Sequence, residues 1–555
     1  MKRKLYLLAI LLFSTTTVIF AQSERLVLLE HFTQASCGPC ALYNPTINTL
    51  LNSNPDVITA IMYHTSWPGY DPMYNHNVED NGARTSYYSV SSVPNSVLDG
   101  NYYNGHPNGW NINSVNNRAA IPSPVDIYMH HELSNDESQI TVTMMIVASE
   151  SVAAGMKTTI AVIEKHIHFN TPPGSNGEID FYNVMKKLLP AASGVILPAM
   201  EAGEYIILQY SWEHQNVYDI NELSAVGFLQ NNLTKEVLQS ANSSAVPIAP
   251  LYTNDAEIFM IDNVSHNYCI GQVQPDIIIR NNGSEELTSL TITYSINGGE
   301  SMTYDWTGNL GFLETETITL EASDFSINEM NNFTFTIENP SGVTDEYPNN
   351  NTRILEIPQA LDAPSPITMI LKLDDNPEET TWEFINSQGE VLYEGGPYTQ
   401  PGQQIVQQFA FNSTDCYTFL IYDAGGDGLL GTGSYAIGYG STIIAQGSKF
   451  GSMDEGQFIV AYTGIDDPVA NEKIQLAPNP ALNEANILFT LAEAGNVSYS
   501  IVNLLGKEVK RLNAGYQAPG EKTFEIDLTG LVSGIYFVNL QVGSVQYVEK
   551  LIKSE

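Results

Sequence analysis

Two cysteines separated by two residues, Cys37 and Cys40, are the residues of this chain best placed to do chemistry. An apolar run precedes them and a stretch with helical spacing of apolar residues follows, so the pair stands where a strand leads into a helix. Unpaired backbone N–H groups and the helix dipole stabilise a thiolate at such a point. The spacing therefore predicts thiol–disulfide exchange, with Cys37 as the nucleophile and Cys40 as the resolving thiol.

The C-x-x-C motif alone also fits half of a zinc site. The flanking residues are therefore needed to distinguish a redox pair from a pair of zinc ligands. Pro45 lies inside the expected helix and predicts a kink there. Val93 and Pro94 precede a second apolar run, and Pro94 is expected to begin a strand in a tight geometry of the kind in which cis bonds occur. These features favour a redox pair over a pair of metal ligands.

With these residues the segment 22–121 resembles the thioredoxin fold, in which a proline of this kind sits beside the redox pair. The resemblance implies that this segment is a thioredoxin-like domain with two sets of site residues. They are a catalytic set of Cys37, Cys40 and Pro94 and a substrate-binding set of Gly38, Pro39 and Val93.

The segment also departs from thioredoxins at three positions. Ser36 stands where thioredoxins usually carry Trp, just before the first cysteine. Glu30 and His31 lie where a buried Asp is expected. The resemblance therefore does not supply the group that handles the proton of the thiol.

The composition indicates a chain of several domains. It has 555 residues with 41 Gly and 28 Pro, and many short runs of Val, Ile, Thr and Tyr are separated by turn-forming residues. We expect a multidomain α/β plus all-β protein, with the thioredoxin-like domain followed by several immunoglobulin-like β-sandwich modules. The formal net charge of −40 repels phosphate backbones, so nucleic acid is not an expected partner.

The N-terminal residues are typical of a secretory signal peptide. Basic residues at positions 2 to 4 precede an apolar run, and cleavage is expected after Ala21, which makes residues 1–21 the signal peptide. No later apolar run is long enough for a transmembrane helix, so none is expected. The protein is predicted to leave the cytoplasm.

The sequence has four cysteines, too few for a disulfide scaffold in a chain of this length. Cys269 and Cys416 fall in different expected domains and are interpreted as buried or free thiols. A bridge between domains is the alternative. Zinc binding together with Cys37 and Cys40 is the least favoured reading.

Residues 122–246 are expected to form an immunoglobulin-like β domain, in which residues 181–190 are interpreted as a short connecting segment. Together with the cysteine-containing domain, they resemble a family of Bacteroidetes outer-membrane and surface proteins named for a 28-kilodalton member. The resemblance rests on Glu30 to Thr33 and on residues 183–190 and 231–239. It implies adhesin-like or thiol-based activity.

Two further β modules are expected, at residues 251–358 and 359–464. The first alternates strands with Asn-Asn-Gly turns and is interpreted as a spacer. In the second, Asp423 and Asp427 flank a glycine-rich turn, which is a candidate calcium site because hard cations favour carboxylates on a tight loop. The alternative is an ordinary hairpin turn that needs glycine for positive φ.

Residues 473–555 carry four sequence blocks whose order and spacing closely resemble the type IX secretion C-terminal sorting domain. The blocks are Leu476–Pro480, Ile501–Val509, Leu531–Val538 and Glu549–Lys553. The resemblance implies the type IX secretion machinery as a partner and passage across the outer membrane, followed by release or attachment at the cell surface. Such a sorting domain is an address and says nothing about chemistry.

His166 and His168 are the remaining candidates for metal binding. On a strand, residues two apart place their side chains on one face, which suits a transition metal. A solvated or core histidine is the favoured alternative.

Two functions follow from the sequence. The first is an exported thiol–disulfide oxidoreductase that acts on a protein disulfide. The second is a surface adhesion or ligand-binding protein in which the thioredoxin-like fold is a scaffold and Cys37 and Cys40 form a structural disulfide. In the second case the aromatic residues between Tyr63 and Tyr103 offer a stacking surface for a carbohydrate or peptide ligand.

Overall fold

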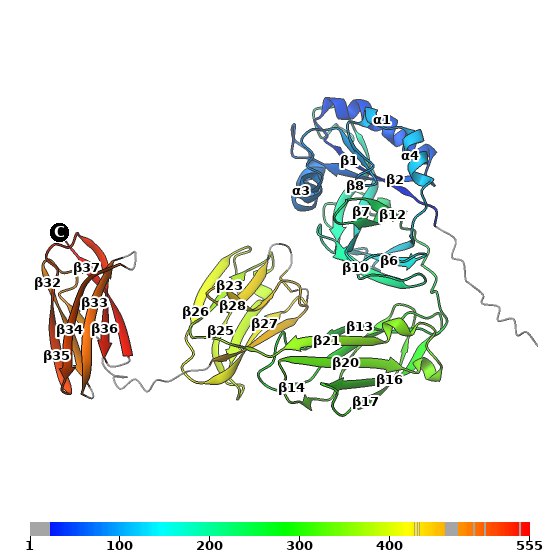
Figure 1. Ribbon diagram of the computed structural model, residues 1–555. Coiled ribbons are helices and arrows are strands. Elements are labelled where there is room, and N and C mark those ends of the chain that lie inside the picture. Colours follow the sequence, from blue (N-terminus) through cyan, green and yellow to red (C-terminus); the bar gives the residue numbers. More distant parts are fainter. Residues whose placement is uncertain are drawn as a thin grey trace, which may run out of the picture. The chain divides into compact units, whose positions relative to one another are not determined.

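The structure is a computed structural model that describes residues 23–426, 428–429, 431, 433–460, 475–491, 494–503, 507–542 and 545–554. The expected signal peptide and Asp427 lie outside the described residues. The chain divides into a first unit that ends at Pro250 and a second unit that begins at Leu251 (Figure 1). Each unit is described by itself below.

The first unit is built around a mixed β-sheet that contains the cysteine pair at one strand end. Its elements are β1 (Val27–Thr33), α1 (Gly38–Ser53), β2 (Ile58–His64), α2 (Pro72–His76), α3 (Val78–Tyr87), β3 (Asn95–Leu98), β4 (Tyr103–Gly105), α4 (Ile112–Ala119), β5 (Val125–Leu133), β6 (Gln139–Ala148), β7 (Met156–His168), β8 (Asp180–Leu189), β9 (Val195–Ile196), β10 (Tyr205–Glu213), β11 (Leu223–Asn231) and β12 (Val237–Asn242). The strand order of the main sheet is β12-β11-β7-β8-β2-β1-β3-β4, with β9 paired to β7. β1 runs parallel to β2 and antiparallel to β3.

Strand β1 is buried along its whole length because both of its faces are covered. Successive side chains of a strand point to opposite faces. Val27 and Leu29 therefore pack with α1 and α4, whereas Leu28 and Phe32 pack in a separate core cluster on the other face. Figure 1 shows α1 and α4 near each other, with α3 apart from them. This two-sided burial fixes the strand that leads into the cysteine pair.

The second half of the first unit continues the same sheet. β7, β8, β11 and β12 extend it, and β8 joins β2 through the parallel pair Met62 and Val184. The strands β10, β6 and β5 form a smaller sheet that shares an apolar core with β7 and β11. The boundary expected after residue 121 therefore runs through one unit.

Residues 181–190 are not the connecting segment that the sequence suggested. They belong almost entirely to β8, which pairs with β7 over most of its length. Both Leu188 and Leu189 are buried, because they face different core clusters on the two sides of the sheet. Lys186 and Lys187 interrupted the apolar pattern, but Lys186 is buried beside Glu164, and the two form an ion pair across the strands.

The second unit contains three β modules, each with two or three sheets around its own apolar core. Residues 251–358 contain β13 (Ala256–Asp262), β14 (Gln272–Val273), β15 (Asp276–Asn281), β16 (Leu287–Ile296), β17 (Met302–Leu310), β18 (Thr315–Thr319), β19 (Ser323–Asp324), β20 (Met330–Glu338) and β21 (Thr352–Pro358). Residues 359–460 contain β22 (Leu361–Asp362), β23 (Ile367–Lys372), β24 (Thr380–Ile385), β25 (Val391–Gly395), β26 (Gln404–Phe409), β27 (Asp415–Asp423), β28 (Ser434–Tyr439), β29 (Thr442–Gly447) and β30 (Met453–Val460). Residues 475–553 contain β31 (Gln475–Ala477), β32 (Glu484–Leu491), β33 (Gly495–Asn503), β34 (Glu508–Gln517), β35 (Gly520–Asp527), β36 (Gly534–Val542) and β37 (Val545–Lys553).

The interpretation of Cys269 and Cys416 as buried or free thiols is wrong. They form a disulfide that joins the module of residues 251–358 to the module of residues 359–460. The backbone N–H groups of Cys269 and Ile270 donate to the side-chain oxygen of Gln457 beside it. The bridge that the sequence offered only as an alternative is the arrangement in the structure.

None of the helices in the described parts of the chain is long and apolar enough to cross a membrane.

Candidate functional site

The sulfur atoms of Cys37 and Cys40 are joined in a disulfide at the first turn of α1. Cys37 is the N-cap of this helix, and its Sγ accepts the backbone N–H of Cys40 at 3.1 Å. Gly38 and Pro39 form the first helical residues, where the missing N–H of proline costs nothing because it would have no partner within the helix. The helix therefore begins where the sequence predicted it, with the first sulfur at its N-terminus.

The segment Val93–Pro94 faces this disulfide. β3 begins directly after Pro94 and pairs with β1, so the sheet brings the segment next to the start of α1. The Val93–Pro94 bond is cis. Cys37 Sγ lies 3.7 Å from the carbonyl oxygen of Val93. The residues that the sequence assigned to the site are thus gathered at one end of β1 and β3.

The disulfide is almost completely shielded from solvent, and chain from the second half of the unit packs beside it. Cys37 is only 2% exposed and Cys40 is fully buried. Residues 174–178, which we call the strap, are part of the connection between β7 and β8 and lie against the segment just before the helix. The Asn176 side chain donates to the carbonyl oxygens of Gln34 and Cys37, both at 3.3 Å. No pattern in the sequence indicates this contact, because the strap is far from the cysteines along the chain.

Further strap contacts involve the residues immediately before Cys37. The backbone N–H of Ser175 donates to Ser36 Oγ at 3.0 Å, and that of Asn176 donates to the carbonyl oxygen of Ala35 at 3.2 Å. Gly174 is required here, because a Cβ would lie 2.2 Å from the Ala35 carbonyl oxygen. The strap therefore packs closely on the entry to α1.

Glu30 and His31 lie on opposite faces of β1 and have different partners. Glu30 accepts hydrogen bonds from the buried Arg84 of α3 and from the Tyr88 hydroxyl. This pairing compensates its charge within the core. His31 faces α1, where its Nε2 lies 3.2 Å from Asn44 Oδ1 and its Nδ1 lies 3.0 Å from Ser96 Oγ. Burial lowers the pKa of His31 to about 4, so the ring is neutral near pH 7.

A polar network lies one helical turn below the disulfide. Asn44 follows Cys40 by four residues, so the two share the buried face of α1. Its amide donates to Thr33 Oγ1 at 3.0 Å and to Glu178 Oε1 at 2.8 Å. The spacing from Cys40 to Asn44 could have been noticed in the sequence, whereas Glu178 could not.

Glu178 ends the strap and is half-buried. Asn176 Nδ2 donates to its Oε2 at 2.5 Å. Burial raises the pKa of Glu178, although the hydrogen bonds from Asn44 and Asn176 act in the opposite direction. The strap thus brings an acid with a perturbed pKa to the helix that holds the disulfide.

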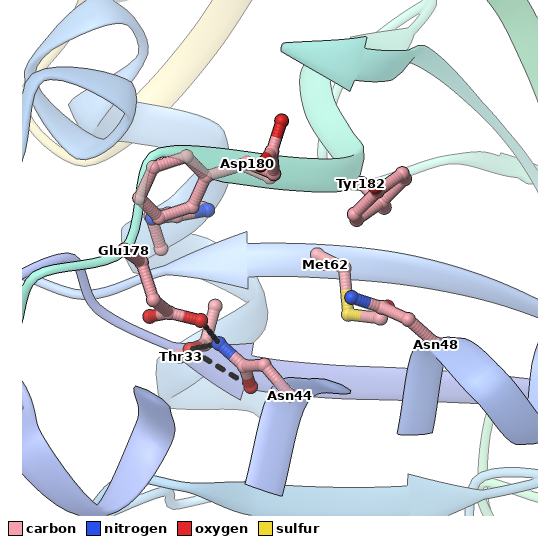
Figure 2. A pocket seen from close by; sticks show the side chains of 9 residues that line it. Thr33, Asn44, Asn48, Met62, Glu178, Asp180 and Tyr182 are labelled. Atoms are coloured by element: carbon pink, nitrogen blue, oxygen red, sulfur yellow. Dashed lines mark hydrogen bonds between the residues drawn. The ribbon is translucent and has the colours of Figure 1, made fainter. Parts of the chain in front are cut away.

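Glu178 and Asn44 line a small cavity between α1 and β8, with about 10 Å³ of free space, enough for one water molecule. Figure 2 shows the Glu178 carboxylate directed at Asn44, with Asn48 and Met62 across the cavity. The other residues that line it are Thr33, His64, Asp180, Phe181 and Tyr182.

His64 and Asp71 form a buried pair beside this cavity, with Nδ1 and Oδ2 2.7 Å apart. Burial opposes ionisation of Asp71, but the contact with His64 and the backbone N–H groups of Ala35 and Tyr74 outweigh burial and lower the pKa of Asp71. The same oxygen of Asp71 accepts the backbone N–H of Ala35. Among the described residues, His64 Nε2 and Asn48 Oδ1 find no hydrogen-bond partner, and both residues line the cavity.

The candidate metal residues have other partners. His166 Nε2 and His168 Nδ1 lie 2.9 and 2.8 Å from the same oxygen of Asp180. These hydrogen bonds lower the pKa of Asp180. In the parts of the chain that the structure describes, no group of three or more His, Cys, Asp or Glu residues is arranged to hold a metal ion.

The glycine-rich turn after β27 is described only in part. Asp423 is buried and its Oδ2 accepts the backbone N–H of Gly428. Asp427 lies outside the described residues, so calcium binding at this turn stays a prediction.

The aromatic residues between Tyr63 and Tyr103 do not form one surface. Tyr63 and Tyr88 are buried and pack against Phe32 in the core. Tyr70 and Tyr102 are exposed. Packing inside the unit therefore accounts for part of the aromatic content that the sequence offered as a ligand surface.

Comparison with known proteins identifies the C-terminal module. Residues 475–554 match the secretion system C-terminal sorting domain. No curated protein sequence matches the chain. Because this domain directs type IX secretion, the protein is exported across the outer membrane to the cell surface or the extracellular space, as the sequence predicted. The type IX secretion machinery is its partner in export.

Solved structures share only a coarse likeness with the chain. HBP35 of Porphyromonas gingivalis has a TM-score of 0.34 and 12% identity, over 60% of this chain and 98% of that chain. The CARDB domain of a Pyrococcus furiosus protein has a TM-score of 0.16 and 18% identity, over 21% of this chain and 95% of that chain. The BSP domain of a biofilm associated protein has a TM-score of 0.17 and 8% identity, over 78% and 96%. Each TM-score is below 0.5, so these likenesses carry no argument about activity. The chain is an exported protein that carries a type IX secretion C-terminal sorting domain at residues 475–554.

Proposed function

We propose that the mature protein is an exported thiol–disulfide oxidoreductase with a thioredoxin-like site in its first unit. The observation that carries the proposal is the position of the Cys37–Cys40 disulfide. It lies at the N-terminus of α1, with Cys37 Sγ 3.7 Å from the carbonyl oxygen of Val93. Such a helix terminus stabilises the thiolate that forms when the disulfide opens, because its N–H groups and dipole face the sulfur.

The proposed reaction transfers the disulfide to a protein dithiol. A substrate thiolate attacks Cys37 Sγ, the Cys37–Cys40 bond breaks, and Cys40 leaves as a thiolate. The second substrate thiolate then attacks the substrate sulfur of the mixed disulfide and releases Cys37. The substrate is oxidised by two electrons and the protein is reduced to a dithiol. We favour this oxidising or isomerising direction because an exported reductase needs an electron source outside the cell.

The test uses the mature chain and a reduced peptide that contains two thiols. We expect one peptide disulfide per protein molecule to form with the wild type, and none with Cys37→Ser. The double variant Cys269→Ser/Cys416→Ser is the matched control, since it removes the other disulfide, and it should keep the activity. If the wild type oxidises the peptide no faster than Cys37→Ser, the proposal is wrong.

A second candidate function is surface adhesion or ligand binding through the β modules, as the resemblance to the 28-kilodalton family also allows. The observation that favours it is the burial of the disulfide, since Cys37 is only 2% exposed and Cys40 is fully buried. In this case Cys37 and Cys40 brace the start of α1. Their joint replacement by Ser would then lower the stability of the first unit while leaving no redox activity to lose.

A further inference from the structure

Lys157 is a buried lysine whose charge has no acidic partner among the described residues. It is the second residue of β7, and only 5% of its surface is exposed. No carboxylate oxygen of the described residues lies within 4.0 Å of its Nζ. Lys186, which is buried to a similar degree, forms an ion pair with Glu164. A buried charge without a counter-charge costs free energy, so a counter-charge at Lys157 would stabilise the folded chain.

Two further cations gather with Lys157 around one aromatic ring. The Nζ atoms of Lys157 and Lys235 each lie 4.7 Å from the centre of the Tyr87 ring. The Cζ atom of Arg84 also lies 4.7 Å from it. Lys235 donates to the carbonyl oxygen of Tyr87, the last residue of α3, where the helix dipole favours a cation. Arg84 is paired with Glu30. The helix end and Glu30 thus account for two of the three cations and leave Lys157 uncompensated.

Hydrogen-bond donors around Lys157 are also left without partners. Arg84 donates to Glu30 through Nε and Nη2, but its Nη1 has no partner among the described residues. In the same described part of the chain, the hydroxyls of Thr159 and Tyr87 have none either. Thr159 shares a face of β7 with Lys157, because it follows by two residues. Buried donors that lack a protein acceptor are usually satisfied by a bound water or an ion.

The turn between β8 and β9 packs closely on the side chains of Lys157 and Thr159. A Cβ at Gly194 would lie 2.8 Å from Thr159 Oγ1 and 3.0 Å from Lys157 Cγ. Arg84 and Thr159 are each 1% exposed, so a ligand that reaches their free donors must be small. Burial and the charge of Arg84 lower the pKa of Lys157, and the charge of Glu30 acts in the opposite direction. These surroundings favour a small ligand that carries a negative charge.

We propose that a small monovalent anion, chloride under physiological conditions, binds between α3 and β7 beside Lys157. The ammonium group of Lys157 is its counter-charge, and Arg84 Nη1 and the hydroxyls of Thr159 and Tyr87 are the donors available to it. Gln230 lies opposite Lys157 on β11, and its Oε1 is an acceptor available to another N–H of the ammonium group. A water molecule would satisfy the same donors but would leave the charge of Lys157 unbalanced. The proposal does not depend on the redox function.

The test measures how chloride changes the local opening of β7 in the mature chain. Hydrogen exchange of the peptide that contains residues 156–162 is followed by mass spectrometry as sodium chloride replaces sodium gluconate, up to about 300 mM. The ionic strength stays constant, and gluconate is too large for the proposed site. A ligand that binds only the closed state slows exchange by the factor 1 + [ligand]/Kd. For the wild type we expect exchange to be about threefold slower or more at the highest chloride concentration, and bromide should act in the same way.

Lys157→Met should abolish the dependence on chloride, because it removes the charge and keeps a long side chain beneath the Tyr87 ring. Lys165→Met is the matched control, since it removes an exposed lysine from the same strand, and it should keep the wild-type dependence. The peptide that contains residues 276–281 of the second unit reports any general effect of the salt on exchange. Its exchange should be the same in chloride and in gluconate.

Two results would overturn the proposal. The first is a wild-type exchange rate that does not change with chloride, which would show that water alone occupies the donors. The second is an equal chloride dependence in the wild type and in Lys157→Met, because the effect would then come from another part of the chain. Neither result changes the outcome of the redox assay of Cys37 and Cys40.

Discussion

Two neighbouring residues of one strand have different hydrogen-bond partners in this protein. Glu30 and His31 are adjacent on β1 and both fully buried, yet they point to opposite faces of the sheet. Glu30 meets Arg84 and keeps its charge paired. His31 meets only neutral partners, Ser96 and Asn44, so a charge on its ring would be uncompensated. His31 therefore contributes to the pH dependence of the first unit.

We predict that this unit loses stability in mild acid through His31. The pKa of the ring is lowered by burial from 6.5 to about 4 in the folded chain. Between these values the unfolded chain binds a proton that the folded chain does not. The contribution of neutral His31 to the free energy of unfolding is therefore full above pH 6.5. As the pH falls to about 4, this contribution is lost, and the free energy of unfolding decreases by roughly 3 kcal/mol.

The free energy of unfolding of residues 23–250 is measured at pH 7 and at pH 4.5. Urea unfolds the protein, and pulse proteolysis reports the unfolded fraction of these residues. In His31→Asn the decrease between the two pH values should be smaller than in the wild type by about 2–3 kcal/mol. The exposed His168→Asn should show the wild-type decrease. Equal decreases in His31→Asn and the wild type would contradict the prediction.

At the scale of elements, the strap packs against the residues that lead into the helix with the disulfide. Residues 174–178 are part of the connection between two central strands, and they hydrogen-bond to the residues that lead into α1. A connection of this kind can open without disturbing the sheet, because β7 and β8 pair independently of it. Access to Cys37 should therefore depend on contacts within the strap.

We predict that Asn176→Ala speeds reduction of the Cys37–Cys40 disulfide by dithiothreitol about tenfold. The side chain of Asn176 donates to Gln34 and Cys37 as well as to Glu178. Hydrogen bonds contribute about 0.5–1.5 kcal/mol each, and about 1.4 kcal/mol corresponds to a factor of ten in opening.

The rate is followed by alkylation and mass spectrometry of the peptide that contains both cysteines. Asn101→Ala is the control, because it removes one loop hydrogen bond, to the Thr234 carbonyl oxygen, elsewhere in the same unit. An unchanged rate in Asn176→Ala would show that the strap does not limit access to the disulfide.

At the scale of the whole molecule, the chain joins a unit with a candidate redox site to β modules and a sorting domain. The modules of residues 251–358 and 359–460 have separate cores, and Cys269–Cys416 links them across 147 residues of sequence. A covalent link between separately folded modules restricts their separation more than it stabilises either core.

We predict that Cys269→Ala/Cys416→Ala loosens the contact between these two modules. The backbone N–H groups of Cys269 and Ile270 donate to Gln457, which belongs to the other module. Their hydrogen exchange, measured by mass spectrometry on the peptide around residue 269, should speed up at least tenfold, since such links contribute about 2–4 kcal/mol. Cys37→Ala/Cys40→Ala should leave this exchange unchanged. Equal exchange in the wild type and in the first double variant would show that Gln457 holds the contact without the disulfide.

Local patterns predicted the parts of this fold that short segments decide. The start of α1 at Cys37, the strand after Pro94 and the strands of the β modules follow from periodicity and turn residues within a few positions. Apolar periodicity did not predict the buried strand at residues 181–190, because two lysines interrupt it. Lys186 is buried because it pairs with Glu164, and that partner lies on a different strand.

The sequence by itself determined the cysteine pair, the helix that follows it and the sorting domain, because each is specified by neighbouring residues. Only the tertiary structure decided the rest of the site. Glu178 bonds Asn44 across 134 residues of sequence, and Cys269 pairs with Cys416 across 147. Spacing along a chain describes which residues share a face of one element. It does not say which distant elements pack together, and here that packing places the acid and the strap beside the disulfide.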